Sequence, residues 1–263
     1  MKTNRTTRVI SSDDGDLIFR LPRKWSELTT NEIRSVFRWM AITDKALLLP
    51  VLFVRLTNAR INRYTDKAVA LSFLDQNGKT VSTWIDYTTF HNLSEILNFV
   101  FDPGAEPVRF PYLNGRTAVD ASLHGVSFGD YIRLETLYQG YLQSQNSQAL
   151  IRIAELLYKP GKKVKPITSL TQWQTLMIVM WVIQIKALFS THFNHFFKPA
   201  ASSEGETPDM IEIINNEIRA LTGGDVSKED EILAIDCWRA LTELNFKAQE
   251  AEEYNRRMAK CKS

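Results

Sequence analysis

The segment LMIVMWVIQIKALF, residues 176–189, constrains the fold more than any other stretch of the chain. Within it, residues 176–183 are apolar on every side of a helix, so a soluble protein has to cover them all round. The run is 14 residues long and is interrupted by Gln184 and Lys186, whereas a membrane span needs about 20 apolar residues. The pattern therefore predicts a buried core helix over about 169–197 and no membrane span.

A helix start stands close to the N-terminus. Thr29 is followed three residues later by Glu32, the spacing of a capping box, in which the two side chains satisfy backbone N–H groups at the start of a helix. From Thr30 onward one apolar stripe recurs at helical spacing. Trp25 precedes the cap and is expected to fold back on that stripe as a lid. A second helix is expected over about 44–57.

The clearest β signal is AVALSFLDQNGKTVSTWID, residues 68–86, in which two β-rich runs flank Asn77-Gly78. Asn-Gly suits the positive φ angles of a type I′ turn, so the stretch predicts a hairpin. The piece DLIFRLP, residues 16–22, reads as a short strand that can add to this sheet. A helix is expected over about 88–99, followed by an irregular connection rich in Pro and Gly.

From residue 127 the patterns are helical, with helices expected over about 147–158, 169–197 and 209–221 and a last one from near Ser227. We therefore expect an α-dominated α+β fold, with a small N-terminal antiparallel sheet and a helical C-terminal part. The expected division is an α+β part (1–110), a helical part with the long buried helix (111–197), a linker (198–208) and a C-terminal helical arm (209–263).

Charge is distributed unevenly along a chain whose net charge is +2. Residues 1–63 hold 12 Lys or Arg against 6 Asp or Glu, while residues 204–263 hold 8 against 14. This asymmetry permits head-to-tail contact between copies, or contact between the two ends of one copy. The low net charge does not favour nucleic-acid binding.

No catalytic or metal-binding constellation emerges from the sequence. His192 and His195 would share one face of a helix, but the intervening Phe193 and Asn194 do not fit a metalloprotease pattern, and aromatic packing at a helix end is favoured. Cys237 lies in an amphipathic pattern and reads as a core residue. There is no G-x-S-x-G elbow. We therefore expect no catalytic residues, no metal and no cofactor.

Two stretches are candidate partner-binding sites. The loop KPGKKVKP brings together Lys159, Lys162, Lys163 and Lys165, which could contact an acidic partner surface or nucleic acid, or remain a solvated loop. The last helix carries an apolar stripe that has to bury against the protein's own body, a partner or a second copy. The stripe consists of Ile232, Ile235, Trp238 and Leu241.

Three further stretches carry a family resemblance: FRLPRKWSELTTNEI (19–33), ALIRIAELLYKPG (149–161) and RALTGGDVSKEDEILAIDCWRALTELNFKAQEAEE (219–253). Together they resemble an uncharacterised family of proteins encoded in phage and prophage tail modules, near the tape-measure gene. None of the three is a mechanistic motif. The resemblance implies a non-enzymatic role in virion assembly or in the tail, and it offers no catalytic residues.

The leading functional expectation is thus a phage tail assembly factor that binds tail or other virion proteins, for example a chaperone that shields apolar helices of a tail component. Self-association is compatible with this role. It would act in the host cytoplasm during assembly, and whether it stays in the virion is left open. The alternative is a DNA-associated regulatory or packaging protein of a mobile element, which would use the basic N-terminal third and the Lys loop.

Overall fold

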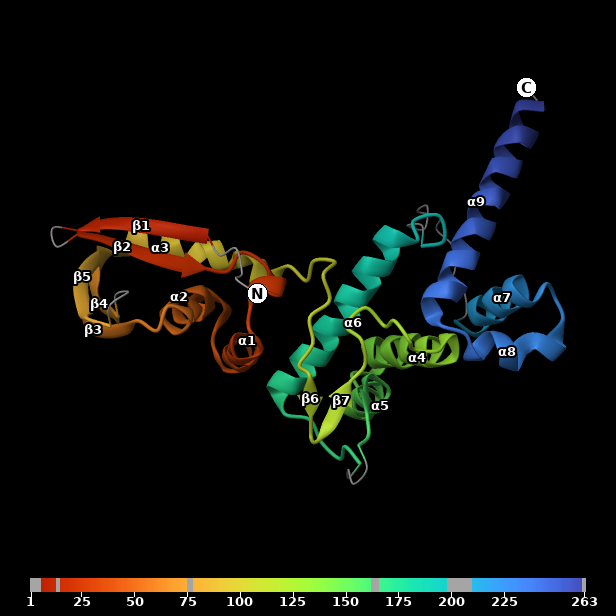
Figure 1. Ribbon diagram of the computed structural model, residues 1–263, viewed down its shortest axis with the longest axis horizontal. Coiled ribbons are helices and arrows are strands. Elements are labelled where there is room, and N and C mark those ends of the chain that lie inside the picture. Colours follow the sequence, from red (N-terminus) through yellow and green to blue (C-terminus); the bar gives the residue numbers. More distant parts are fainter. Residues whose placement is uncertain (1–5, 13–14, 75–77, 162–165, 198–209, 262–263) are drawn as a thin grey trace. The chain divides into compact units, whose positions relative to one another are not determined.

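A computed structural model describes the chain except for residues 1–5, 13–14, 75–77, 162–165, 198–209 and 262–263 (Figure 1). It forms two compact units. The first comprises residues 1–110 together with 171–177, and the second comprises residues 111–170 and 178–263. The expected linker, 198–208, lies outside the described residues.

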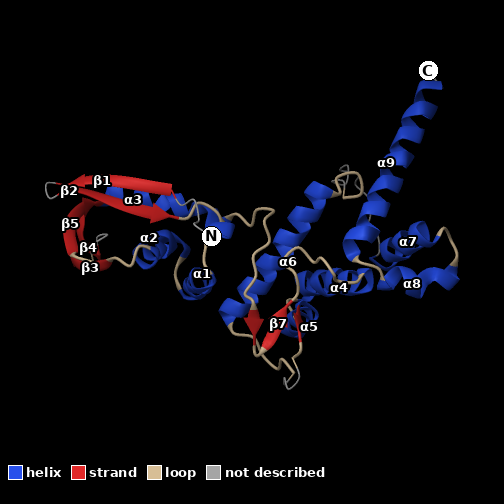
Figure 2. Cartoon of the chain, in the orientation of Figure 1, coloured by secondary structure: helices blue, strands red, loops and turns tan. Residues whose placement is uncertain are grey.

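In its described residues, the first unit contains strands β1 to β5 and helices of its own (Figure 2). An antiparallel hairpin is formed by β1 (Thr6–Ser12) and β2 (Gly15–Leu21). A separate antiparallel sheet has the order β3-β4-β5 and consists of Arg60–Tyr64, Ala68–Leu74 and Thr80–Asp86. The helices are η1 (Trp25–Glu27), α1 (Thr30–Ile42), α2 (Lys45–Leu56), α3 (Tyr87–Ser94) and η2 (Glu95–Phe101).

The capping box at the start of α1 is confirmed, since Thr29 and Glu32 exchange both hydrogen bonds. Trp25 is the expected lid. Its ring stacks on Phe37 of α1 at 5.3 Å between centroids, and its indole N–H donates to the Asp102 carbonyl at 3.0 Å. The indole is thus buried with its polar atom satisfied, which closes one end of this core.

The hairpin expected over 68–86 is confirmed by the pairing of β4 with β5, in which Leu74 lies opposite Thr80. Gly78 has the positive φ angle, +77°, that its place in the turn requires. The expectation that residues 16–22 would extend this sheet is wrong, because β2 pairs with β1 instead. The third strand is β3, whose polar sequence RINRY gave no strand signal.

The second unit is mainly helical. Its helices are α4 (Phe128–Ser144), α5 (Ser147–Leu157), the greater part of α6 (Gln172–His192), α7 (Met210–Thr222), η3 (Val226–Lys228), α8 (Glu229–Ala234) and α9 (Cys237–Cys261). A small sheet in the order β6-β7-β8 is built from Tyr112–Leu113, Arg116–Ala118 and Tyr158–Lys159. The structure is 62% helical with 14% strand, so the α-dominated α+β class is confirmed.

The long helix α6 is buried on one side only. Met177, Ile178, Trp181 and Val182 are at most 1% exposed. The expectation of all-round cover is wrong, because other apolar positions of the same run are only half-buried: Leu176, Val179, Met180 and Ile183. Among the described residues, α6 is the one helix long and apolar enough to cross a membrane, with 39% of its most apolar 18-residue window buried. A core helix of a soluble protein also meets that criterion.

The single last helix expected from Ser227 is in fact two helices, α8 and α9. Ile235 between them is extended, with φ −67° and ψ 160°. The Asp236 carboxylate then accepts a hydrogen bond from the Trp238 backbone N–H at 2.9 Å, which satisfies a donor in the first turn of α9. An aspartate inside an apolar stripe was the sequence signal for this break.

Candidate functional site

The predicted apolar stripe of the last helix faces mainly inward. Leu241 is fully buried, together with Cys237, Ala240 and Leu244. Ile232, Ile235 and Trp238 are half-buried. The structure therefore places most of the stripe against the protein's own body, and its use by a partner stays a prediction.

A short main-chain contact joins the start of α9 to the turn before α4. The Cys237 N–H donates to the Val126 carbonyl, and the Phe128 N–H donates to the Ile235 carbonyl, both at 2.8 Å. The Asp236 carboxylate also accepts from the Gly125 N–H at 2.6 Å. Residues some 110 positions apart are thus held as a two-stranded bridge, which makes the first turn of α9 part of this core.

Aromatic side chains surround Trp238. Its indole N–H donates to the Ser122 carbonyl at 2.6 Å, and His124 stacks on its ring at 4.4 Å between centroids. His192, at 5.0 Å, and two phenylalanines contact the same indole. His195 is engaged elsewhere, since its Nδ1 lies 3.3 Å from Glu252 Oε2. His192 and His195 thus have different neighbours. The described residues contain no group of three or more His, Cys, Asp or Glu arranged to hold a metal.

Cys237 has the surroundings of a packed thiol. It is fully buried, and its Sγ lies 3.3 Å from the Leu123 carbonyl, to which it can donate. Burial, with the nearby Asp236 carboxylate, raises the pKa of the Cys237 thiol to about 12. A thiol that stays protonated is a poor nucleophile, which agrees with the core role inferred from the sequence.

Of the four predicted lysines, the structure describes only Lys159, at the end of β8. Its ammonium lies 3.2 Å from Asp130 Oδ2 and is half exposed. Lys162, Lys163 and Lys165 lie outside the described residues. Lys159 is therefore held in a surface ion pair, and contact of the loop with a partner stays a prediction.

The stretch of α9 (Figure 1) that follows its buried first turns, residues 246–258, is the strongest candidate for a binding surface. Three large apolar side chains there are exposed: Phe246 by 56%, Tyr254 by 62% and Met258 by 43%. Their spacings of eight and four residues place them along one i, i+4 ridge of the helix. We define Phe246, Tyr254 and Met258 as the α9 ridge. Sequence reasoning missed it because charged residues surround these three in a segment that reads as a polar tail.

Hydrogen bonds and ion pairs stabilise the helix that carries the α9 ridge. Asn245 Oδ1 accepts from the N–H groups of His195 and Phe196 at 3.0 and 3.1 Å, which anchors the helix just before the ridge. Farther along, i, i+4 ion pairs link Glu252 to Arg256 and Glu253 to Arg257. Such pairs stabilise an isolated helix by a few tenths of a kcal/mol each. The ridge is thus presented on a preformed helix.

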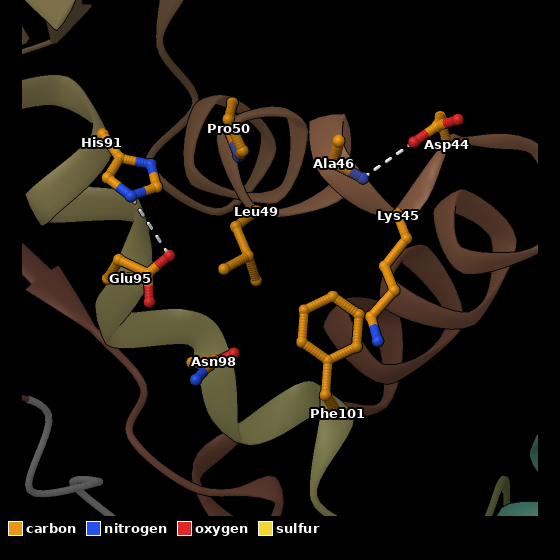
Figure 3. Close-up of a pocket in the computed structure, with 9 residues that line it drawn as sticks. All are labelled: Asp44, Lys45, Ala46, Leu49, Pro50, His91, Glu95, Asn98 and Phe101. Carbon is orange, nitrogen blue, oxygen red and sulfur yellow. Dashed lines mark hydrogen bonds and ion pairs between the residues drawn. The ribbon is translucent and has the colours of Figure 1, made fainter.

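A second candidate is a hollow of about 730 Å³ beside the first turn of α2 (Figure 3). Leu49 and Pro50 contribute apolar surface, and the ammonium of Lys45 lies 5.1 Å from the centre of the Phe101 ring. On the other side, His91 Nε2 lies 3.5 Å from Glu95 Oε1. The rim thus carries both signs of charge on exposed side chains, an arrangement suited to a polar ligand or peptide but not specific for one chemistry.

A charged cluster lies inside the second unit, where α4, α6 and α7 contribute Glu135, Lys186 and Glu217. Glu135 Oε1 pairs with the Lys186 ammonium, while Glu135 Oε2 is buried with no hydrogen-bond partner among the described residues. Burial, and then repulsion from Glu135, raise the pKa of Glu217 to about 7. Burial, and then the negative charges of Glu135 and Glu217, also raise the pKa of Tyr131 of α4. The cluster therefore favours a neutral Glu217.

We expect this cluster to make stability fall as pH rises. Between about pH 4.5 and 7 the unfolded chain releases the Glu217 proton and the folded chain keeps it, so folding weakens across that window and levels off above pH 7. After allowance for solvent screening, the loss is about 2 kcal/mol. Glu217→Gln should remove this slope in urea titrations from pH 4 to 8. Glu212→Gln, at an exposed position of the same helix, is the control, and equal slopes in both variants would contradict the expectation.

Comparison with known proteins adds no homologue: no family model, curated protein or solved structure matches this chain.

Proposed function

We propose that this protein is a non-enzymatic phage tail assembly factor that binds another tail or virion protein through the α9 ridge. The observation that carries the binding role is the exposure of Phe246, Tyr254 and Met258 along one line of a preformed helix. The phage context rests on the family resemblance of the sequence. The protein would act in the host cytoplasm during assembly, and a chaperone for a tail component is one form of this role.

Exposure of the apolar α9 ridge to water is unfavourable in free energy. Three large apolar side chains on one helical line bury surface only when another apolar surface covers them. An amphipathic helix that lies in a groove of its partner does this through apolar anchors on one face, and the α9 ridge places its anchors at i, i+8 and i+12, with Glu250 at the intervening i+4 position. Aromatic residues and methionine are enriched in the cores of protein interfaces. The charged residues beside the ridge would form the polar rim of such a contact.

The alternative, a DNA-associated protein of a mobile element, is favoured by the arginines of the first unit. Arg60 and Arg63 of β3 are exposed. The two functions differ in their response to salt. Binding to duplex DNA weakens steeply as salt rises, whereas association through an apolar ridge tolerates salt.

The test is co-purification of the full chain with the tail proteins encoded beside it. We expect a stable complex at about 0.5 M salt, a condition that screens exposed charges. The triple variant Phe246→Ala, Tyr254→Ala, Met258→Ala should weaken it at least about tenfold, because apolar anchors dominate such interfaces.

The matched control removes three exposed apolar side chains elsewhere, with Ile42→Ala, Leu47→Ala and Leu142→Ala. This control should bind as the unsubstituted chain does, and both variants should keep its unfolding midpoint. A ridge variant that is folded and binds its tail partner with unchanged affinity would overturn the proposal.

A further inference from the structure

One side of the β3-β4-β5 sheet carries two rows of residues that follow from the strand register, which shifts between Ile61 and Arg63 of β3. Arg63 lies opposite Ala70, which lies opposite Trp84, so these three form one row across the sheet. Arg60, Ser72 and Ser82 form the next row. Directly paired residues share a face of a sheet. The side chains of β4 on this side are small, and those of the outer strands are an exposed tryptophan and two exposed arginines.

The opposite side of the sheet is packed at Phe73 and Ile85, whereas Trp84 and the two arginines of the rows are exposed. We call the side with the two rows the free side. The ring of Phe73 contacts Phe19 of β2 at 4.7 Å between centroids, and Phe19 in turn contacts Phe53 of α2. On the free side Trp84 is 54% exposed, although tryptophan is among the most buried residues on average. Tryptophan and arginine are also the residues most enriched among binding hot spots.

The free face is basic and borders a hollow. A cavity of about 500 Å³ at one end of the sheet is lined in part by Arg55, Arg60, Leu74 and Thr80. The nearby carboxylate of Asp86 is already engaged, since it accepts from the backbone N–H and the hydroxyl of Thr89 as the cap of α3. Asp66 lies in the turn beyond β3. We define Arg60, Arg63 and Trp84, with the adjoining hollow, as the basic sheet face.

The second unit carries a surface of opposite charge. The corner between α7 and α8 exposes Asp225, Asp230 and Glu231. Val226, in the middle of that corner, is 78% exposed. Asp225 holds the corner in shape, because its carboxylate accepts from the backbone N–H and the hydroxyl of Ser227 and pairs with the Lys228 ammonium at 3.5 Å. The acidic flank is therefore formed chiefly by Asp230 and Glu231. We define residues 225–231 as the acidic corner, a protruding turn with an apolar tip and an acidic flank.

We propose that the basic sheet face of one copy binds the acidic corner of a second copy. The two surfaces are complementary in charge, with arginines on one and carboxylates on the other. They are also complementary in shape, since an exposed valine protrudes from the corner and a hollow borders the sheet. The same polarity appears along the sequence, where residues 1–63 carry an excess of 6 positive charges and residues 204–263 an excess of 6 negative ones.

Such a contact is head-to-tail, because it uses two different surfaces. Each copy keeps one unused surface after it binds its neighbour, so the contact propagates into a ring or an open filament instead of stopping at a dimer. This contact uses different residues from the α9 ridge and a different partner, a second copy of the chain.

The test uses the full chain and two charge-reversal variants. One is Arg60→Glu with Arg63→Glu, and the other is Asp230→Arg with Glu231→Arg. Molar mass is measured by light scattering from about 1 to 200 µM, the range of weak interfaces. The unsubstituted chain should grow beyond a dimer, and its association should weaken about tenfold between low and high salt.

Each variant alone should be monomeric, because each has lost one of the two surfaces. An equimolar mixture should associate again, because the unchanged corner of the first variant fits the unchanged sheet face of the second, and the two reversed surfaces are also opposite in charge. If charge reversal unfolds α8, the milder double variant Asp230→Asn with Glu231→Gln is used in its place. Reversal of Arg256 and Arg257 to Glu, on α9, is the control and should leave self-association unchanged.

The proposal is overturned if the unsubstituted chain is monomeric throughout, or if the folded variants associate as it does. It is equally overturned if the variants are monomeric but do not pair in the mixture, because the contact would then join like surfaces. A monomeric chain that binds single-stranded DNA through Arg60 and Arg63 would assign the sheet face to nucleic acid. Tail-protein binding by the sheet-face variant is measured in parallel, so failure of self-association is distinguished from failure of the proposed function.

Discussion

Replacing Trp181 by alanine is expected to lower the free energy of unfolding by about 3–5 kcal/mol. The side chain is fully buried in α6, its ring meets that of Tyr158 edge-on at 5.8 Å between centroids, and its indole N–H donates to the Ala121 carbonyl at 2.8 Å. The substitution therefore leaves a cavity and removes the donor from a partly buried carbonyl at once. Urea unfolding followed by circular dichroism measures the loss.

The matched control is Ile183→Ala, two residues away on the same helix but half-buried. It should cost less than half as much, because part of its side chain already faces solvent. Similar losses at the two positions would mean that α6 is covered all round, as the sequence pattern alone predicts. An unchanged midpoint for Trp181→Ala would instead show that the packed side of α6 is wrongly assigned.

Deleting residues 204–263 is expected to leave a remainder that aggregates or fails to fold cooperatively in its second unit. The deletion removes the four most buried residues of α9, namely Cys237, Ala240, Leu241 and Leu244, each at most 3% exposed. It also removes Trp238 from between four aromatic rings. The apolar surface exposed by this loss has no other cover in the described part of the unit. Light scattering and circular dichroism of the truncated chain are the measurements.

A shorter truncation, which ends the chain after Glu253, distinguishes the role of the buried turns of α9 from that of its exposed end. It removes Tyr254 and Met258 but leaves the buried turns of α9 and its Asn245 anchor. This variant should stay soluble with an unfolding free energy within about 1 kcal/mol of the full chain, as surface changes generally do. If the proposed function holds, this variant should also bind a tail protein less well than the full chain does. A soluble, cooperatively folded 1–203 fragment would contradict the core role and support a separable arm.

Much of the fold follows from local signals in the sequence. The capping box of Thr29 and Glu32 and the turn signal of Asn77-Gly78 act within a few residues, so the sequence predicts α1 and the β4-β5 hairpin directly. The strand β3 could not be predicted in this way. Its residues are exposed along their whole length, and its pairing with β4 supplies the hydrogen bonds that define it.

The candidate sites were less predictable because they depend on contacts distant in the sequence. The stripe of Trp238 and Leu241 was correctly read as apolar, but whether it meets the protein's own body depends on a turn more than 100 residues earlier. The α9 ridge consists of isolated apolar residues in a charged segment, which single-sequence patterns treat as solvated. The basic sheet face becomes visible only when the strand register brings Arg63 and Trp84 into one row.

The burial of Cys237 has a consequence for how the motions of α9 can be measured. Because the thiol is enclosed and stays protonated, it can react with an alkylating reagent only when the first turn of α9 leaves the turn at residues 123–126. With Cys261→Ser, Cys237 becomes the single thiol of the chain. Its labelling rate in native buffer then reports the opening frequency of this one contact, separately from global unfolding. A tail protein that locks α9 in place would slow that rate, and one that pulls α9 free would accelerate it.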